Sequence, residues 1–180
     1  MTAGDFDALF DEFTSTVVRL ETLPEFRVGG AEQERIDAWR AGRPRPLRSV
    51  ATDPWLARIA RTTMSDGKVW RRVRILEDPP TEYQRYQLAG YVEAQTVGDQ
   101  VRVAIRPDVL DDDGPDFWLF DEGLPTARAA VMHYDAEGRW LGWDLVAEAS
   151  ALAELGERVR RVDAVAVPLN EYLARKAGNA

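Results

Sequence analysis

The first third of the chain places its hydrophobic residues at helical spacing. A period of three to four residues joins Phe6, Leu9, Phe10, Phe13 and Val17. This pattern predicts an amphipathic helix from residue 5 to about residue 19. Two further helices are expected, over 31–41 and over 54–66. The second of these has Asp53 as its N-cap and Gly67 as its C-terminal stop.

From Lys68 onward the hydrophobic period changes to two. Residues 68–76 alternate between two faces and predict a strand, which a pair of prolines ends. Thr81 and Gln84 have the spacing of a capping box, which opens a helix to about Glu93. The remaining pattern predicts strands over 101–106, 117–120, 127–134 and 139–146, and helices over 147–162 and 168–176.

These elements predict an α/β fold with a mixed sheet of about five strands and helices on both faces. One helix crosses from strand 68–76 to strand 101–106, so that pair should be parallel with a right-handed connection. Strands 127–134 and 139–146 are joined by a short loop with a glycine and should form an antiparallel hairpin. We expect a helical segment, 1–66, packed on an α/β domain, 67–180, as one folding unit.

Charge is distributed unevenly along the chain. The net charge is −8, yet residues 35–74 hold eleven basic side chains against three acidic ones, a local charge of +8. A cationic segment in an acidic protein suggests an anionic ligand or partner. The acidic total argues against sequence-independent binding to duplex DNA, although a narrow cationic patch stays open as a nucleic-acid site.

Composition also bears on location and cofactors. The chain has no cysteine, which excludes disulfides and thiolate metal sites. The N-terminus lacks the pattern of a signal peptide, and no stretch reaches the roughly 18 apolar residues of a membrane span. We therefore expect a cytoplasmic protein that does not enter the membrane, with no cofactor and no metal. The oligomeric state is left open.

Two arginines on strand 68–76 are the main candidates for a binding site. Arg72 and Arg74 share a face and lead toward three residues of the following helix, Tyr83, Arg85 and Tyr86. Guanidinium groups beside aromatic rings suit a phosphate or carboxylate ligand. The competing interpretation is structural, in which Arg72 and Arg74 pair internally with Glu82, Glu21 or Asp121. The connector arginines Arg40, Arg43, Arg45 and Arg48 are expected to be exposed.

No constellation of residues specifies catalysis. His133 is the chain's one histidine, and no serine elbow of the type G-x-S-x-G accompanies it, so a structural role is favoured. The acidic run Asp108, Asp111, Asp112, Asp113 and Asp116 does not have calcium-loop spacing. A solvated loop is the simpler interpretation. No catalytic or metal-binding residue is assigned.

Several segments together resemble a known family. They are 19–22 (RLET), 72–75 (RVRI), 80–86 (PTEYQRY), 116–121 (DFWLFD), 132–135 (MHYD) and 138–142 (GRWLG). Over roughly residues 5–170 the chain is similar to an uncharacterised actinobacterial domain of unknown function, often encoded beside Xre-type helix-turn-helix regulators. The resemblance implies a regulatory neighbourhood and no established chemistry.

A weaker similarity connects the same region to half of a phospholipase-D-like α/β domain. That resemblance implies a His-x-Lys pair with a downstream Asp, such as Asp121. Here Tyr134 and Asp135 follow His133, and no lysine takes the required position. A shared fold would therefore be a degenerate one, without the catalytic site.

Three functional hypotheses follow. The leading one is a non-enzymatic regulatory module that binds a protein partner, such as a helix-turn-helix regulator, or a small anionic ligand. Its site would use Arg72, Arg74, Tyr83, Arg85, Tyr86, Asp121 and His133. The alternatives are a hydrolase or phosphotransfer toxin using Asp121 and His133, and nucleic-acid binding through residues 35–74.

Overall fold

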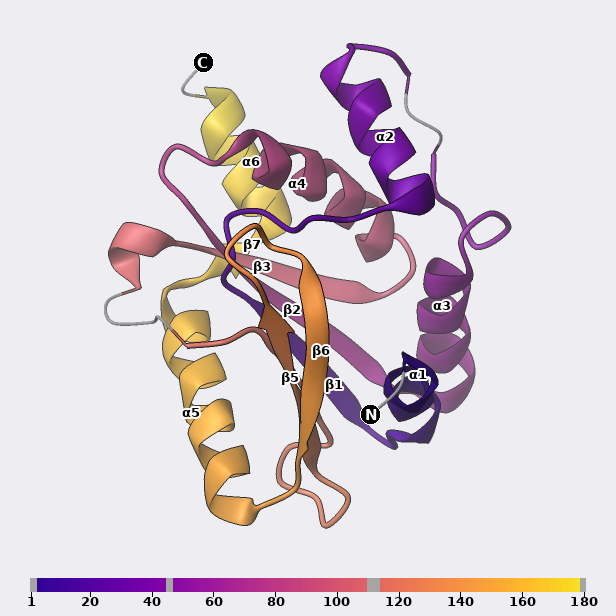
Figure 1. The fold of residues 1–180 in the computed structure, drawn as a ribbon, viewed down its shortest axis with the longest axis vertical. Coiled ribbons are helices and arrows are strands. Elements are labelled where there is room, and N and C mark those ends of the chain that lie inside the picture. The colour runs from indigo at the N-terminus through magenta and orange to yellow at the C-terminus, as the bar shows by residue number, and fades with distance from the viewer. Residues whose placement is uncertain (1–2, 45–46, 110–113, 179–180) are drawn as a thin grey trace.

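The computed structural model describes residues 3–44, 47–109 and 114–178. Within these ranges one mixed sheet has the strand order β6-β5-β4-β1-β2-β3-β7 (Figure 1). Its strands are β1 (Thr16–Glu21), β2 (Val69–Leu76), β3 (Asp99–Ile105), β4 (Phe117–Phe120), β5 (Arg128–Tyr134), β6 (Trp140–Val146) and β7 (Val167–Pro168). The helices are α1 (Ala3–Glu12), α2 (Gly30–Arg40), α3 (Pro54–Asp66), α4 (Glu82–Gln95), α5 (Ala149–Val165) and α6 (Leu169–Gly178), with a 3₁₀ turn, η1 (Arg106–Asp108).

The sheet confirms the predicted mixed α/β class. Strands β1, β2 and β3 are parallel, and α4 connects the parallel pair β2 and β3 as expected. The β5–β6 hairpin is antiparallel, as are the pairs β1–β4, β4–β5 and β3–β7. The sheet has seven strands among the described residues rather than about five, because the sequence patterns of β1 and β7 predict no strand.

The prediction of a helix reaching residue 19 is wrong. Helix α1 ends at Glu12, and Thr16–Glu21 forms β1 at the centre of the sheet. Val17 to Glu21 are buried, because the strand has neighbours on both edges and is covered on both faces. A strand buried in this way lacks the alternation that identifies a half-exposed strand. Val17 also continues the helical spacing of α1, which extended the predicted helix into the strand.

The predicted helix ends are confirmed where side chains cap them. Asp53 accepts hydrogen bonds from the backbone N–H groups of Trp55 and Leu56 at the start of α3, and Gly67 ends that helix with φ +67°. Thr81 and Gln84 form the expected capping box of α4. These caps satisfy backbone groups that helix ends otherwise leave unpaired.

Helices cover both faces of the sheet (Figure 1). On one face α1 and α3 enclose an aromatic cluster that contains Phe10, Trp70 and Trp118. On the other face Val159 and Val162 of α5 pack against residues such as Val73 of β2. Helix α4 packs with α6 over β3, and α2 lies against α4. The loop and helix α2 between β1 and α3 thus form a wall facing α4, where the candidate site lies.

Candidate ligand-binding cavity

Arg72 lies in a network of internal ion pairs. Its Nη1 is 2.6 Å from Glu21 Oε1 on β1, and its Nε is 3.3 Å from Asp99 Oδ2 on β3. The guanidinium group also stacks over the rings of Tyr91 and Trp118, with its central carbon 5.0 and 5.5 Å from their centroids. Glu21 is one of the internal partners predicted for Arg72, and Asp99 is a partner that the sequence did not indicate.

The network extends along β1 to Arg19. Arg19 Nη2 is 3.1 Å from Asp116 Oδ2, and Asp116 Oδ1 accepts hydrogen bonds from the backbone N–H and the hydroxyl of Thr22. Glu21 Oε2 accepts a hydrogen bond from the Tyr91 hydroxyl. Burial alone would raise the pKa of Glu21, but Arg72, Arg19 and Arg74 outweigh it and lower this pKa to about 2. Glu21 is therefore the charged centre of the network.

Arg74 has an internal structural position. Its side chain is fully buried, with Nε 3.1 Å from Gln87 Oε1 on α4 and Nη2 2.5 Å from the carbonyl oxygen of Leu23. Its guanidinium group also lies over the Phe26 ring. Arg74 therefore joins β2, α4 and the segment after β1, and it is not among the residues that line the cavity described next.

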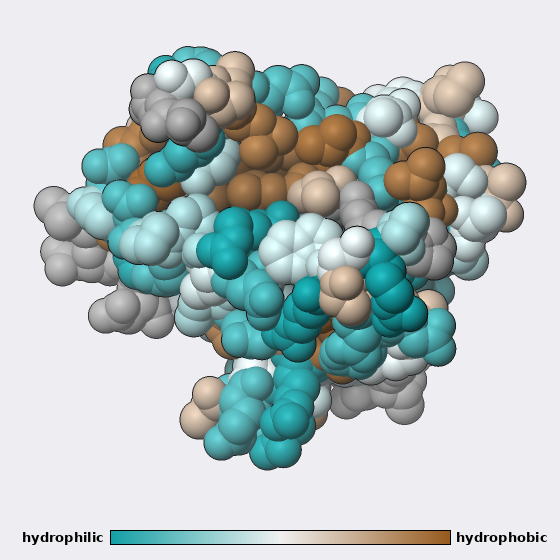
Figure 2. Space-filling model, turned by 90° about the horizontal axis from the view of Figure 1, so that it is seen from above, coloured by the Kyte–Doolittle hydropathy of each residue, from teal (hydrophilic) through white to brown (hydrophobic). Residues whose placement is uncertain are grey.

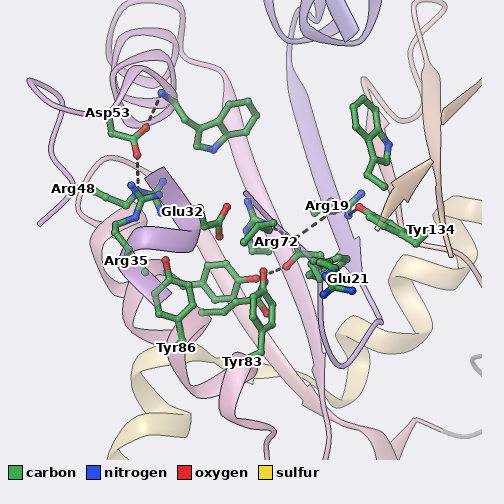
Figure 3. A pocket seen from close by; sticks show the side chains of 18 residues that line it. Arg19, Glu21, Glu32, Arg35, Arg48, Asp53, Arg72, Tyr83, Tyr86 and Tyr134 are labelled. Atoms are coloured by element: carbon green, nitrogen blue, oxygen red, sulfur yellow. Dashed lines mark hydrogen bonds and ion pairs between the residues drawn. The ribbon is translucent and has the colours of Figure 1, made fainter. Parts of the chain in front are cut away.

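A cavity of about 450 Å³ lies above this network, between β1, β2, α2, α4 and the 47–53 segment (Figure 3). Its charged lining comprises five arginines and three carboxylates, a net charge of +2. These residues are Arg19, Arg27, Arg35, Arg48, Arg72, Glu21, Glu32 and Asp53. Its aromatic lining consists of Phe26, Trp55, Tyr83, Tyr86, Tyr91, Tyr134 and Trp140. The volume lies within the range of small-molecule sites, roughly 300–1,000 Å³.

Two of the lining guanidinium groups contain buried nitrogen atoms without a hydrogen-bond partner among the described residues. They are Nη1 of Arg19, a side chain only 3 % exposed, and Nε of Arg35. Buried N–H groups are nearly always paired with protein, water or a ligand, and leaving one unpaired costs about 1–3 kcal/mol. Each group is therefore suited to an acceptor brought into the cavity.

Helix α2 and the following segment place opposite charges side by side. Glu32 and Arg35 lie one helical turn apart on α2, and both point toward the cavity with Arg48 beside them (Figure 3). Arg48 Nε is 2.6 Å from Asp53 Oδ2.

Glu32 differs from the other lining carboxylates. It is half-buried, and no hydrogen bond or ion pair joins it to another described residue. Burial raises the pKa of Glu32, and the neighbouring Arg35 and Arg48 offset only part of this effect. Burial also raises the pKa of the Tyr83 hydroxyl, and the charge of Glu32 adds to that shift. Glu32 and Tyr83 are thus electrostatic neighbours inside the cavity.

The α4 residues predicted for the site separate onto two sides of the helix. Tyr83 and Tyr86 are buried and line the cavity with Arg72. Arg85 is exposed, and its Nη1 donates to the carbonyl oxygen of Pro80 at 2.7 Å. The Arg85 side chain borders a groove of about 700 Å³ between α4 and α6. These two helices lie at the end of the molecule that faces the viewer in Figure 2. Arg85 does not join the cavity.

Asp121 and His133 do not share a site. Asp121 follows β4 and accepts hydrogen bonds from the backbone N–H groups of Thr14, Ser15 and Thr16. His133 lies toward the opposite end of the β4–β5 pair, where its Nε2 is 2.8 Å from Asp144 Oδ2. Measured along the strands, Asp121 and His133 are six residues apart, which corresponds to about 20 Å. His133 instead borders a second cavity, of about 630 Å³.

Several basic residues of segment 35–74 pair with acidic residues from elsewhere in the chain. Among the described residues, Arg58 pairs with Asp7, Arg40 with Glu82, and Arg71 with Asp163. Arg40 and Arg43 are exposed as expected, whereas Arg48 is half-buried, and Arg45 lies outside the described residues. Part of the charge of this cationic segment is thus taken up by separate ion pairs.

The acidic run is only partly described. Asp108 is exposed at the end of η1, and Asp116 is fully buried against Arg19. Asp111, Asp112 and Asp113 lie outside the described residues. Across residues 3–44, 47–109 and 114–178, no group of histidine and acidic side chains has the arrangement of a metal site.

Sequence reasoning missed most of the cavity's charged residues. Arg19 and Glu21 lie in β1, whose residues Val17 to Glu21 are all buried and which the helical spacing of the preceding segment assigned to a helix. Glu32 and Arg35 have a spacing of three on a correctly predicted helix, which was the signal available for a shared face. No feature of the neighbouring sequence indicated that the face of α2 with Glu32 and Arg35 lies opposite α4.

The fold and the cavity define an α/β protein with an arginine-rich, aromatic pocket beside the parallel part of its sheet. The chain belongs to a family described as a domain of unknown function, DUF6879, whose sequence model matches residues 4–174. No curated protein and no solved structure matches it. None of the helices described is both long enough and apolar enough to span a bilayer.

Proposed function

We propose that this protein is a non-enzymatic binding module whose cavity holds a small anionic ligand. The observation that carries the proposal is the pair of buried guanidinium nitrogens, Arg19 Nη1 and Arg35 Nε, that lack partners among the described residues. Both belong to side chains that line the same cavity. Acceptor oxygens of a carboxylate or phosphate group satisfy such donors and match the local net charge.

The ion-pair network supports binding rather than chemistry at this site. Arg72 and Glu21 are held by each other and by Asp99 and Tyr91, so they form a rigid, charged floor. A preorganised floor reduces the side-chain ordering that binding otherwise costs. The ligand would bind above this floor and contact Arg35, with Arg19 at the side of β1.

The biological setting of the proposal is regulatory and cytoplasmic. It rests on the resemblance to an actinobacterial family encoded beside Xre-type helix-turn-helix regulators. We assign the neighbouring regulator as the protein partner that responds to the ligand-bound state. Co-purification of the two proteins, with and without a bound anion, tests this part separately from the cavity.

Replacing Arg35 with Gln is expected to weaken anion binding about tenfold or more. The reason is the loss of a charge-assisted hydrogen bond, which contributes about 1.5–3 kcal/mol. The measurement is isothermal titration calorimetry with inorganic phosphate, citrate and L-glutamate, supported by thermal shifts. The control is Arg40→Gln, because Arg40 is exposed at the end of the same helix and pairs with Glu82. Equal affinities for both variants, or no binding to the wild type, would contradict the proposal.

A further inference from the structure

We propose that the ligand is an anionic zwitterion, with an ammonium group beside one carboxylate and a second carboxylate at its far end. An α-amino acid with an acidic side chain has this chemistry. The inference deepens the proposed function and rests on it, since it names the ligand class of the same cavity.

The first argument is the adjacent pair of opposite charges on α2. Glu32 and Arg35 lie one turn apart and point into the cavity together, with Arg48 beside Arg35 (Figure 3). An α-amino acid carries its ammonium and carboxylate groups on one carbon atom. A carboxylate next to a guanidinium group can therefore bind both groups at once, whereas a simple anion satisfies only Arg35.

The second argument is the state of Glu32. Its half-buried carboxylate has no hydrogen bond from another described residue, although it lies at the centre of the cavity wall. A ligand without a donor would bring its negative charge close to this carboxylate and incur repulsion. A ligand ammonium group instead neutralises Glu32 and donates hydrogen bonds to its carboxylate.

Aromatic side chains complete the environment of an ammonium group. Tyr83 lies close enough to Glu32 for their charges to interact, and its ring centroid is 6.1 Å from that of Tyr86. Both rings line the cavity. A cation near the face of an aromatic ring is stabilised by the ring's quadrupole, and a carboxylate beside such rings is a suitable site for an ammonium group.

The third argument is the second unpaired donor. Arg19 lies on β1, across the cavity from Arg35, with Glu32 and Arg72 between them in the view of Figure 3. Its buried Nη1 donates to no described residue, whereas its Nε donates to Glu21 and its Nη2 to Asp116. A second carboxylate on the ligand would reach this end. The resulting ligand has a net charge of −1, which suits a lining of net charge +2.

The experiment compares ligands that differ only in the ammonium group. L-glutamate is titrated against glutarate, and L-aspartate against succinate, by isothermal titration calorimetry. The wild-type protein should bind at least one amino form about tenfold more tightly than its des-amino counterpart. Glu32→Gln should remove that preference, whereas Glu34→Gln, an exposed position on the same helix, should retain it.

The outcomes separate this inference from the proposed function. If phosphate or citrate binds in an Arg35-dependent way but the amino forms have no advantage, the cavity is a general anion site and the zwitterion is rejected. A preference that survives Glu32→Gln also rejects it. If none of the anions binds, both proposals fail. Circular dichroism and thermal unfolding of each variant ensure that only folded proteins are compared.

Discussion

Replacing Glu21 with Gln is expected to lower the free energy of unfolding by about 3–5 kcal/mol. The substitution removes the negative charge that Arg72 and Arg19 share in the interior of the sheet. It also exchanges one acceptor oxygen for an amide that faces two guanidinium groups and the Tyr91 hydroxyl. Breaking a buried ion pair costs more than the pair contributes, because the remaining charges stay buried without compensation. Urea unfolding followed by circular dichroism measures the effect.

The same network predicts an acid-sensitive component of stability. The pKa of Glu21 is lowered from an ordinary 4.5 to about 2 in the folded protein. The folded state therefore binds this proton more weakly than the unfolded state. The corresponding stability is fully present above pH 4.5 and is lost as the pH falls toward 2. Glu21→Gln should have a shallower pH dependence than the wild type in this interval.

The matched control for Glu21 is an exposed ion pair. Arg58 and Asp7 form a hydrogen-bonded pair at the surface, where Asp7 is mostly exposed. Asp7→Asn should cost roughly 0.2–1 kcal/mol, as exposed pairs generally do. A Glu21→Gln variant as stable as Asp7→Asn would show that the network is not an essential part of the folded state, and the rigid floor of the cavity would have to be reconsidered.

Replacing Asp121 with Asn is expected to destabilise the protein by about 2–4 kcal/mol. Asp121 is 1 % exposed, and its carboxylate accepts from the N–H groups of residues 14–16 and from the hydroxyls of Thr14 and Thr126. An amide group has one acceptor oxygen instead of two and places an NH₂ group against these donors. Asn tolerates the φ of +53° at this position, so the variant isolates the hydrogen bonds from backbone strain.

The pH dependence of this variant has a defined sign. Burial alone would raise the pKa of Asp121, but the N–H groups of Thr14, Ser15 and Thr16 outweigh it and lower the pKa below its ordinary value of 3.8. Stability that Asp121 contributes is therefore lost at acidic pH. Asp144→Asn is the control, since this carboxylate is exposed beside His133. If Asp121→Asn were as stable as the wild type, Asp121 would be free for a functional role.

Local sequence patterns predicted the strands and helices that have a recognisable period or cap. Helix α3 begins and ends at the predicted capping residues, Asp53 and Gly67, and the alternation of residues 68–76 corresponds to β2. β1 was missed because its residues are buried on both faces and follow an amphipathic helix without a clear break. The two-residue β7 is too short to have a period. Its pairing with β3 depends on the contacts of α5 and α6 with the sheet.

For the candidate site, the sequence predicted the charge of the basic segment but not the partners of its arginines. Its charge of +8 is a property of the sequence, and so is the alternation that places Arg72 and Arg74 on one face of a strand. Their partners are residues 13 to 51 positions away, Glu21, Asp99, Leu23 and Gln87. Ion pairing at such separations has no local period. The sequence therefore predicted both the anion-binding and the internal interpretation without choosing between them.

The amino-acid sequence by itself determined the mixed α/β class, the capped helices and the concentration of arginines in one segment. Only the tertiary structure decided that Arg72 and Arg74 pair internally and that Arg19 and Arg35, from β1 and α2, line a cavity with unpaired buried nitrogens. Arg74, whose Nη1 also has no partner among the described residues, does not line that cavity. The physical reason is that periodicity records which face of an element is buried. The availability of a charge depends on which opposite charge folding brings within hydrogen-bonding distance.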